Sequence, residues 1–420
     1  MSLSSAMYSG VSGLMAYGDA MNVTGDNLAN VNTVGFKGNK TVFADILANS
    51  VANGASTLQF GRGSMIQAVT ASFAQGSFET TGNATDMAIQ GAGFFVVRDS
   101  ANGANYYTRA GQFTLNENGD LVNPSDYIVQ GYKLTTNASG GVTRASSASD
   151  IDITGVQSAP SVTTNMRVGI NLNATASAAT TFSSSLNVYN AVGEAVTLTV
   201  TFTKATTAQT WTYAFSSSDG TIGGAGASGT ATFSSTGALV GIGSSTTALS
   251  DQSLTITSFG SGAADLAFTW DIVNTAGASQ ADMTGYASDS VTNSVVQDGN
   301  STGVLRGLSV DSKGIISGLF SNGQTQQLWQ VELADFLSPW GLSRVGNSLF
   351  AETAQSGQPI LGVGKAGGFG SIYGSSLELS NVDLSQQFVD MIQNQRAYQA
   401  NSRVISTVDQ MLQEVVNLKR

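Results

Sequence analysis

The sequence predicts a multidomain α+β protein. N- and C-terminal helices are expected to pair as a coiled-coil domain, and two mainly antiparallel β domains, barrel- or sandwich-like, are expected between them. Three observations carry this prediction. Apolar residues repeat every seven positions at both ends of the 420-residue chain. Runs in the middle alternate apolar and polar residues. Turn dipeptides such as Asn118-Gly119 separate these runs.

A heptad repeat predicts the N-terminal helix over residues 3–30. Glycines interrupt this repeat, and each costs about 1 kcal/mol relative to alanine, so the helix needs a partner to fold against. Small residues also allow a partner helix to approach closely. The apolar seam consists of Met7, Val11, Leu14, Met21 and Leu28.

Side-chain amides follow this seam. Asn27, Asn30 and Asn32 are expected to end the helix, because amide side chains compete with the backbone for hydrogen bonds. They are also expected to satisfy backbone groups where the chain turns away from the helix. Gly35 is expected to adopt a backbone angle that is closed to other residues.

A second heptad repeat predicts the C-terminal helix over residues 381–418. Ser380 or Asn381 is expected to cap its start, with Asp383 placed to complement the helix dipole. Many glutamines and asparagines lie between the apolar positions. Because amides both donate and accept hydrogen bonds, they suit packing against copies of the same chain. The residues expected in assembly are Leu384, Phe388, Met391, Gln395, Arg396, Tyr398, Asn401, Ile405 and Leu412.

The middle of the chain is predicted to form strands. In AVTLTVTFTK, residues 195–204, apolar residues alternate with threonines, which predicts a half-buried strand. Polar passages at 146–164 and 287–303 indicate domain boundaries. The expected domains are 1–32 with 380–420 (helical coiled coil), 33–70 with 366–379 (connector), 71–158 with 295–365 (β domain) and 159–294 (inserted outer β domain).

The composition excludes several classes of function. Charged residues make up 11% of the chain and the net charge is −11, so we expect no binding to nucleic acid or membrane. The absence of Cys and His excludes thiol nucleophiles, Ser-His-Asp triads, disulfides and the usual zinc sites. We therefore expect no enzyme, no catalytic, cofactor-binding or metal-binding residues, and no cofactor.

Two weaker signals are set aside. Gly362, Gly364 and Gly367 match G-x-G-x-x-G, but glycines and serines follow where a dinucleotide-binding helix is needed. This stretch is interpreted as a connector. Scattered carboxylates are interpreted as turn residues.

The first residues lack a basic segment followed by an apolar one, so no cleaved signal peptide is expected.

The two chain ends carry long motifs. These are SGVSGLMAYGDAMNVTGDNLANVNTVGFK (9–37) and LELSNVDLSQQFVDMIQNQRAYQANSRVISTVDQMLQEVVNL (377–418). They resemble the paired terminal motifs of the bacterial flagellar rod and hook axial protein family. GSFETTGNATDMAIQGAGFFVVRD (76–99), YYTRAGQFTLNENGDLVN (106–123) and GLSRVGNSLFAETAQSG (341–357) are similar to β segments of that family. Together these stretches and the ends cover about a third of the chain.

Within that family, the length and the insertion at 159–294 resemble a hook subunit. The resemblance implies a structural subunit that self-assembles into a curved tube, outside the cell, and acts as a universal joint between rod and filament. It implies export by the flagellar type III export apparatus. The implied partners are further copies of the chain, the distal rod protein, the hook cap protein and the hook-filament junction protein. The alternatives are a distal rod protein and, from a different class, a cell-surface β-rich adhesin.

Overall fold

The chain forms two compact units. The computed structural model describes residues 3–47, 49–53, 56–136, 141–245, 247–274, 279–280 and 282–417. The first unit consists of Met1–Gly155, Gly307–Gly318 and Gln326–Arg420. The second consists of Val156–Arg306 and Leu319–Thr325. The finer division into four domains, with the boundaries given above, stays a prediction.

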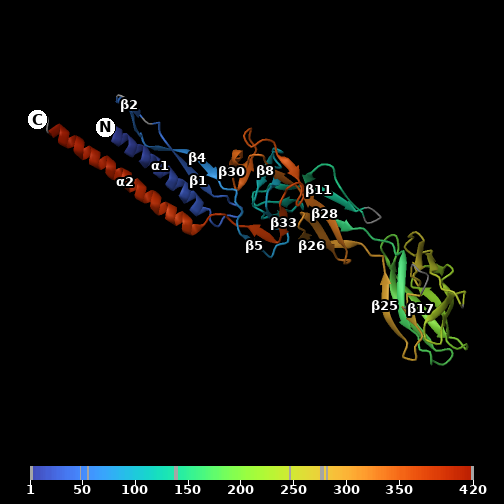
Figure 1. Ribbon diagram of the computed structural model, residues 1–420. Helices are drawn as coiled ribbons and strands as arrows, with labels where there is room; N and C mark the ends of the chain where they lie inside the picture. The colour runs from blue at the N-terminus through green and yellow to red at the C-terminus, as the bar shows by residue number, and fades with distance from the viewer. Residues whose placement is uncertain are drawn as a thin grey trace. The chain divides into compact units, whose positions relative to one another are not determined.

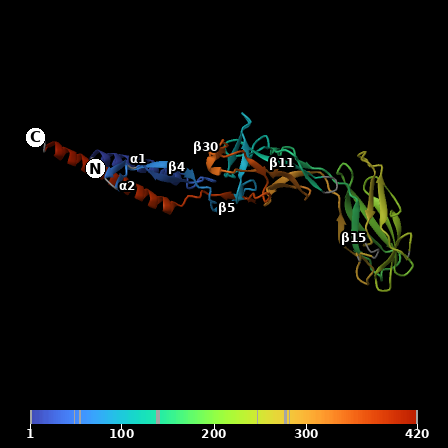
Figure 2. The ribbon, with the colours of Figure 1, turned by 45° about the horizontal axis from the view of Figure 1, so that its top comes forward.

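Two long helices lie side by side in the first unit, with both chain ends at the same end of the pair (Figures 1 and 2). Helix α1 spans Leu3–Ala29 and helix α2 spans Leu384–Asn417. The cap of α2 is Asp383, whose Oδ1 accepts hydrogen bonds from the backbone N–H groups of Ser385 at 2.8 Å and Gln386 at 3.2 Å. The expectation that Ser380 or Asn381 caps the helix is therefore corrected, because α2 begins after these residues.

Two strands accompany the helix pair. Strands β1 (Asn39–Asp45) and β4 (Ser64–Ala71) pair antiparallel and run along α1 (Figure 1). Strands β2 (Asn49–Asn53) and β3 (Ser56–Phe60) form a further antiparallel pair between them in sequence. The chain therefore leaves α1, folds back along it, and only then enters the β body of the first unit.

The β body of the first unit is a mainly antiparallel sheet along the path β28-β11-β7-β8-β31-β30. An aromatic cluster that includes Phe94, Tyr107 and Phe350 fills its core. The short pairs β5–β34 and β6–β33 join the segment after β4 to the segment before α2. The remaining strands of this body are β5 (Phe78–Thr80), β6 (Met87–Gln90), β7 (Phe94–Arg98), β8 (Asn105–Thr108), β9 (Thr114–Leu115), β10 (Leu121–Val122), β11 (Ile128–Thr136), β12 (Val142–Arg144), β13 (Ser149–Asp150), β26 (Gly303–Val310), β27 (Ile315–Phe320), β28 (Thr325–Val331), β29 (Leu333–Asp335), β30 (Ser343–Gly346), β31 (Leu349–Ala351), β32 (Ile360–Gly362), β33 (Ser371–Gly374) and β34 (Ser376–Glu378), with a 3-10 turn at Pro339–Gly341.

The second unit is a β sandwich. A five-stranded sheet, β16-β17-β18-β20-β21, and a six-stranded sheet that contains β15, β19 and β22–β25 share one apolar core. Trp211 and Trp270, one from each sheet, lie in that core and are each 1% exposed. The strands are β14 (Gln157–Ser158), β15 (Asn165–Asn171), β16 (Thr181–Tyr189), β17 (Ala195–Lys204), β18 (Thr210–Ser217), β19 (Thr221–Gly223), β20 (Ser228–Phe233), β21 (Leu239–Gly243), β22 (Gln252–Thr257), β23 (Leu266–Trp270), β24 (Met283–Thr284) and β25 (Val291–Gln297).

The predicted fold class is confirmed. The terminal helices pack together and the body is mainly antiparallel β. Strand β17 matches the stretch predicted at 195–204, and its alternate residues point into the sandwich core. After the glycines at 362, 364 and 367 comes strand β33 instead of a helix, which agrees with the connector interpretation.

Candidate functional site

The paired helices meet along a stripe of small residues on α1. A Cβ atom built on Gly13 would lie 2.8 Å from the side-chain nitrogen of Asn401, and one on Gly10 would lie 3.1 Å from Cγ1 of Ile405. The two glycines therefore admit α2 to a distance that larger residues would block. The buried stripe consists of Gly10, Gly13, Ala16, Ala20, Thr24 and Asn27.

The predicted apolar seam of α1 flanks this contact instead of forming it, and the expectation for α1 is corrected, whereas Tyr398 and Ile405 of the predicted α2 seam do lie against glycines of α1. A heptad search selects large apolar residues, whereas these two backbones approach each other through small ones. Met7, Leu14, Met21 and Leu28 are half-buried, and Val11 is exposed. On α2, Met391, Tyr398, Asn401 and Ile405 are half-buried, whereas Leu384, Phe388, Gln395, Arg396 and Leu412 are exposed. Val408, which the sequence analysis missed, is the buried apolar residue of α2.

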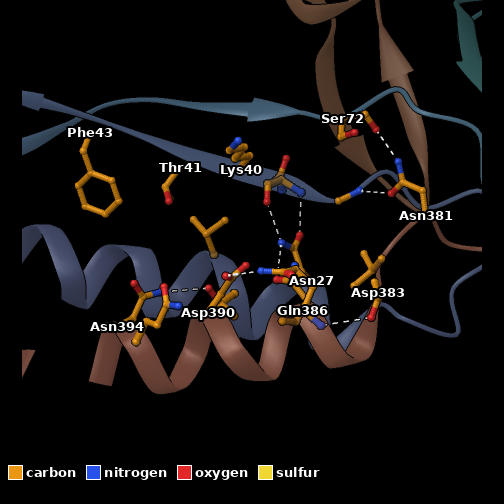
Figure 3. A pocket seen from close by; sticks show the side chains of 17 residues that line it. Asn27, Lys40, Thr41, Phe43, Ser72, Asn381, Asp383, Gln386, Asp390 and Asn394 are labelled. Carbon is orange, nitrogen blue, oxygen red and sulfur yellow. Dashed lines mark hydrogen bonds between the residues drawn. The ribbon is translucent and has the colours of Figure 1, made fainter. Parts of the chain in front are cut away.

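Three amide side chains tie the helix pair to strand β1 and to the residues next to β1 and β4, and we call Asn27, Asn381 and Gln387 the amide clamp. Asn27 donates to the Asn39 carbonyl at 2.7 Å and accepts from the Asn39 N–H at 2.7 Å. It also donates to Oε1 of Gln387 at 3.1 Å. Asn381 accepts from the N–H of Gly38 at 2.8 Å and donates to the carbonyls of residues 72 and 74 at 2.7 and 3.0 Å. Figure 3 shows this arrangement around Asn27 and Asn381.

Of the other residues of the N-terminal amide stretch, Asn30 bonds to the end of the helix. Asn30 donates to the carbonyl of Asp26 at 2.9 Å and accepts from the hydroxyl of Thr33 at 3.1 Å, so its side chain bonds to the last turn. Asn32 is exposed. Gly35 has a φ of +67°, and a Cβ there would lie 2.5 Å from the nitrogen of Ala110. The predicted backbone conformation of Gly35 is thus confirmed.

A buried ion cluster of Lys37, Arg109 and Glu378 lies where the helices join the β body. Lys37 Nζ lies 2.6 Å from Oε1 of Glu378, and both side chains are 0% exposed. Arg109 lies 3.4 Å from the other carboxylate oxygen. The same carboxylate accepts from the N–H of Gly76 at 2.9 Å, and Lys37 donates to the carbonyl of Ala74 at 2.9 Å. One carboxylate therefore binds four chain segments together.

The electrostatics of the cluster are dominated by burial. Burial lowers the pKa of Lys37, and the neighbouring Glu378 carboxylate opposes that shift. Burial likewise lowers the pKa of Arg109, again against the attraction of Glu378. The Arg109 guanidinium also lies over the ring of Phe94, 5.2 Å from its centre. Glu378 is the carboxylate that pairs with both cations, so its loss would leave Lys37 without its ion-pair partner and Arg109 with the smaller attraction of Asp335.

Beside the clamp, a groove of about 600 Å³ lies between α1, α2 and β1 (Figure 3). Most of the lining side chains are polar, and Val23, Phe43 and Val382 are the apolar ones. Thr24 and Lys40 belong to the α1 and β1 walls, and the α2 wall is made of carboxylates and amides. The α2 residues of the lining are Asp383, Gln386, Gln387, Asp390, Gln393 and Asn394, where Asp383 is the residue that caps α2.

The ion cluster and most of the clamp were not predicted as site residues. Lys37 and Glu378 lie within the two terminal motifs, but the sequence does not indicate that residues 341 positions apart meet. A usable signal was the scarcity of charge: with 11% charged residues in the chain, Lys37, the one basic residue of the motif at 9–37, is a candidate for pairing with a carboxylate. In the part of the chain that the structure describes, no group of three or more metal-ligating residues occurs. No described helix is long and apolar enough to cross a membrane.

The family models that match this chain cover its two helical ends and parts of its β-rich middle. Models described as "Flagella basal body rod protein", "Flagellar hook protein FlgE/F/G D1 domain", "Flagellar basal body protein FlaE D2 domain" and "Flagellar basal body rod FlgEFG protein C-terminal" match residues 7–37, 88–176, 160–300 and 374–418. The chain is 31% identical to flagellar hook protein FlgE of Borreliella burgdorferi, over 99% of both chains. It is 34% identical to that of Salmonella typhimurium, over 97% of this chain and 98% of the relative. A crystal structure of Helicobacter pylori flagellar hook protein FlgE2 matches 71% of this chain and 100% of its own, with 16% identity and a TM-score of 0.46.

The chain belongs to the flagellar hook protein family. It is a structural subunit of the flagellar hook, and the predicted resemblance is confirmed. The roles of the individual helix residues in assembly remain predictions.

We expect Glu378→Gln to destabilise the first unit by about 3–5 kcal/mol, because it leaves the buried Lys37 without its ion-pair partner and removes the larger of the attractions on Arg109. Chemical denaturation, followed by the fluorescence of a probe on the β body, measures the change. Glu79→Gln on the neighbouring strand is the matched control, because Glu79 is exposed opposite Leu377. An equal effect of the two substitutions would contradict the role of the buried cluster.

We expect Asn27→Ala to cost about 1–3 kcal/mol, because both backbone groups of Asn39 lose their side-chain partner. Hydrogen exchange at the Asn39 amide should accelerate in step with this loss. Asn32→Ala, at an exposed position of the same stretch, should leave that exchange rate unchanged. Unaltered exchange in the Asn27 variant would show that the clamp does not hold β1.

Proposed function

We propose that copies of this chain assemble into a curved tubular hook, which joins the rod to the filament and transmits torque as a universal joint. The observation that carries this proposal is the exposure of α2. Large apolar side chains lie exposed in two groups, one at the start of α2 and one in its second half, and exposed apolar patches mark protein contacts. They are Leu384, Phe388, Val389, Ile392, Val404, Met411, Leu412, Val415 and Val416. A second copy of the chain is the partner that this proposal assigns to them.

The second unit suits the outer part of such a joint. The outward face of β16 and β17 carries paired hydroxyls and amides, such as Ser185 with Thr199 at 2.9 Å and Thr197 with Asn187 at 3.0 Å. Ser183 and Thr201 form another pair at 3.3 Å. Uncharged, short side chains present no ion pairs that must break when neighbouring subunits move. This supports a surface that slides as the joint rotates.

The remaining partners follow from the place of a hook in the flagellum. We infer contacts with the distal rod protein at one end, and with the hook cap and hook-filament junction proteins at the other. Export by the flagellar type III apparatus would bring the subunit outside the cell. A non-enzymatic role is consistent with a family of structural subunits. The rival distal rod assignment is disfavoured because the second unit is matched by a separate domain model at residues 160–300.

Electron microscopy of a deletion strain, with and without the restored gene, tests this function. The deletion should leave basal bodies with complete rods and no hooks, and the restored gene should return curved hooks. Rods that stop short in the deletion strain would show that the chain builds the rod. Unaltered flagella would overturn the proposed function altogether.

A further inference from the structure

The face of α2 that points away from α1 carries two arginines without a counter-charge. Arg396 and Arg403 are exposed, and among the described residues neither forms an ion pair within 4.0 Å. They lie seven residues apart, so they occupy one face of the helix at a separation of about 10 Å. Val389 and Ile392 on this face are 48% and 49% exposed. Exposed apolar groups beside unpaired cations indicate a surface that a partner covers.

The groove beside the amide clamp holds the matching acids. Asp383 and Asp390 both line it, and they too lie seven residues apart on α2 (Figure 3). Asp383 accepts two backbone hydrogen bonds, and Asp390 accepts one from Nε2 of Gln386 at 2.8 Å. Lys40 of β1 also lines the groove, so its ionised side chains are two carboxylates and one amine. The groove thus offers negative charge at the spacing at which the opposite face offers positive charge.

The two faces point in different directions. A helix turns about 100° per residue, so each arginine lies about 140° around the axis from the aspartate thirteen positions before it. One α2 can therefore meet a neighbour on either side through different surfaces. Such a contact is head-to-tail and does not close on itself, which is the geometry of an open helical polymer.

We propose that the Arg396–Arg403 face of α2 in one copy docks into the Asp383–Asp390 groove of the next copy. The proposal rests on the proposed function, and it names the residues that set the register between neighbouring subunits. Parallel α2 helices displaced by thirteen residues, or about 20 Å, bring Arg396 to Asp383 and Arg403 to Asp390. The partner is a second copy because one helix supplies both pairs at the same spacing.

Charge reversal at the pair Arg403 and Asp390 tests the contact, because neither residue caps the helix. In the complemented deletion strain, Arg403→Asp and Asp390→Arg should each lower the number of hooks per cell about tenfold, since each places like charges together. The chain should then accumulate in the culture medium, which shows that export continues. The double variant, Arg403→Asp with Asp390→Arg, should restore hook numbers to within about twofold of the unaltered chain. Asp409→Arg is the matched control, because Asp409 is exposed on α2 and lies away from both faces.

The outcomes separate the two proposals. If the unaltered chain forms hooks and the single variants form them equally well, the contact is wrong and the hook function stands. If the singles fail and the double variant fails equally, the two residues do not meet and the contact is again overturned. If the unaltered chain gives no hooks, the proposed function fails, and this contact fails with it.

Discussion

The first unit depends on one buried carboxylate. Glu378 binds Lys37 and Arg109 and also accepts a backbone N–H, with no exposure to solvent. Burial of charge is costly, and a buried ion pair often adds little net stability over an apolar equivalent. The ion cluster instead favours one arrangement of the chain. A buried carboxylate must be neutralised, and only this arrangement brings both cations to it. The residues that follow α1 and precede α2 are thereby held against the β body.

The contact between the two helices depends on small and amide side chains instead of buried charges. Small residues on α1 let the backbones approach, and the amide clamp then bonds the pair to β1 without burying another charge. The large apolar residues of α2 are left exposed, and we propose that they make contacts between copies of the chain. Under that proposal, one set of residues makes the fold and another serves assembly, which suits a subunit of a polymer.

The sequence alone was sufficient to predict the architecture, but it did not predict the contacts between the elements. Heptad spacing and alternation located both helices and strand β17, since these periodicities reflect which face is buried. The positive φ of Gly35 was also predictable from its place after the helix. The line of contact on α1 was not, because a heptad rule weights large residues and this contact uses small ones. The meeting of Lys37 with Glu378 joins distant positions, and nothing local in either segment specifies its partner.

Hydrogen exchange at the junction tests the central claim most directly. The amides of Gly35 and Gly76 donate to the backbone oxygen and to the carboxylate of Glu378, respectively. If the buried carboxylate fastens the chain ends to the β body, these amides should exchange as slowly as those of core strand β7, through opening of the whole unit. Exchange many times faster than in β7, through a local opening, would contradict the account.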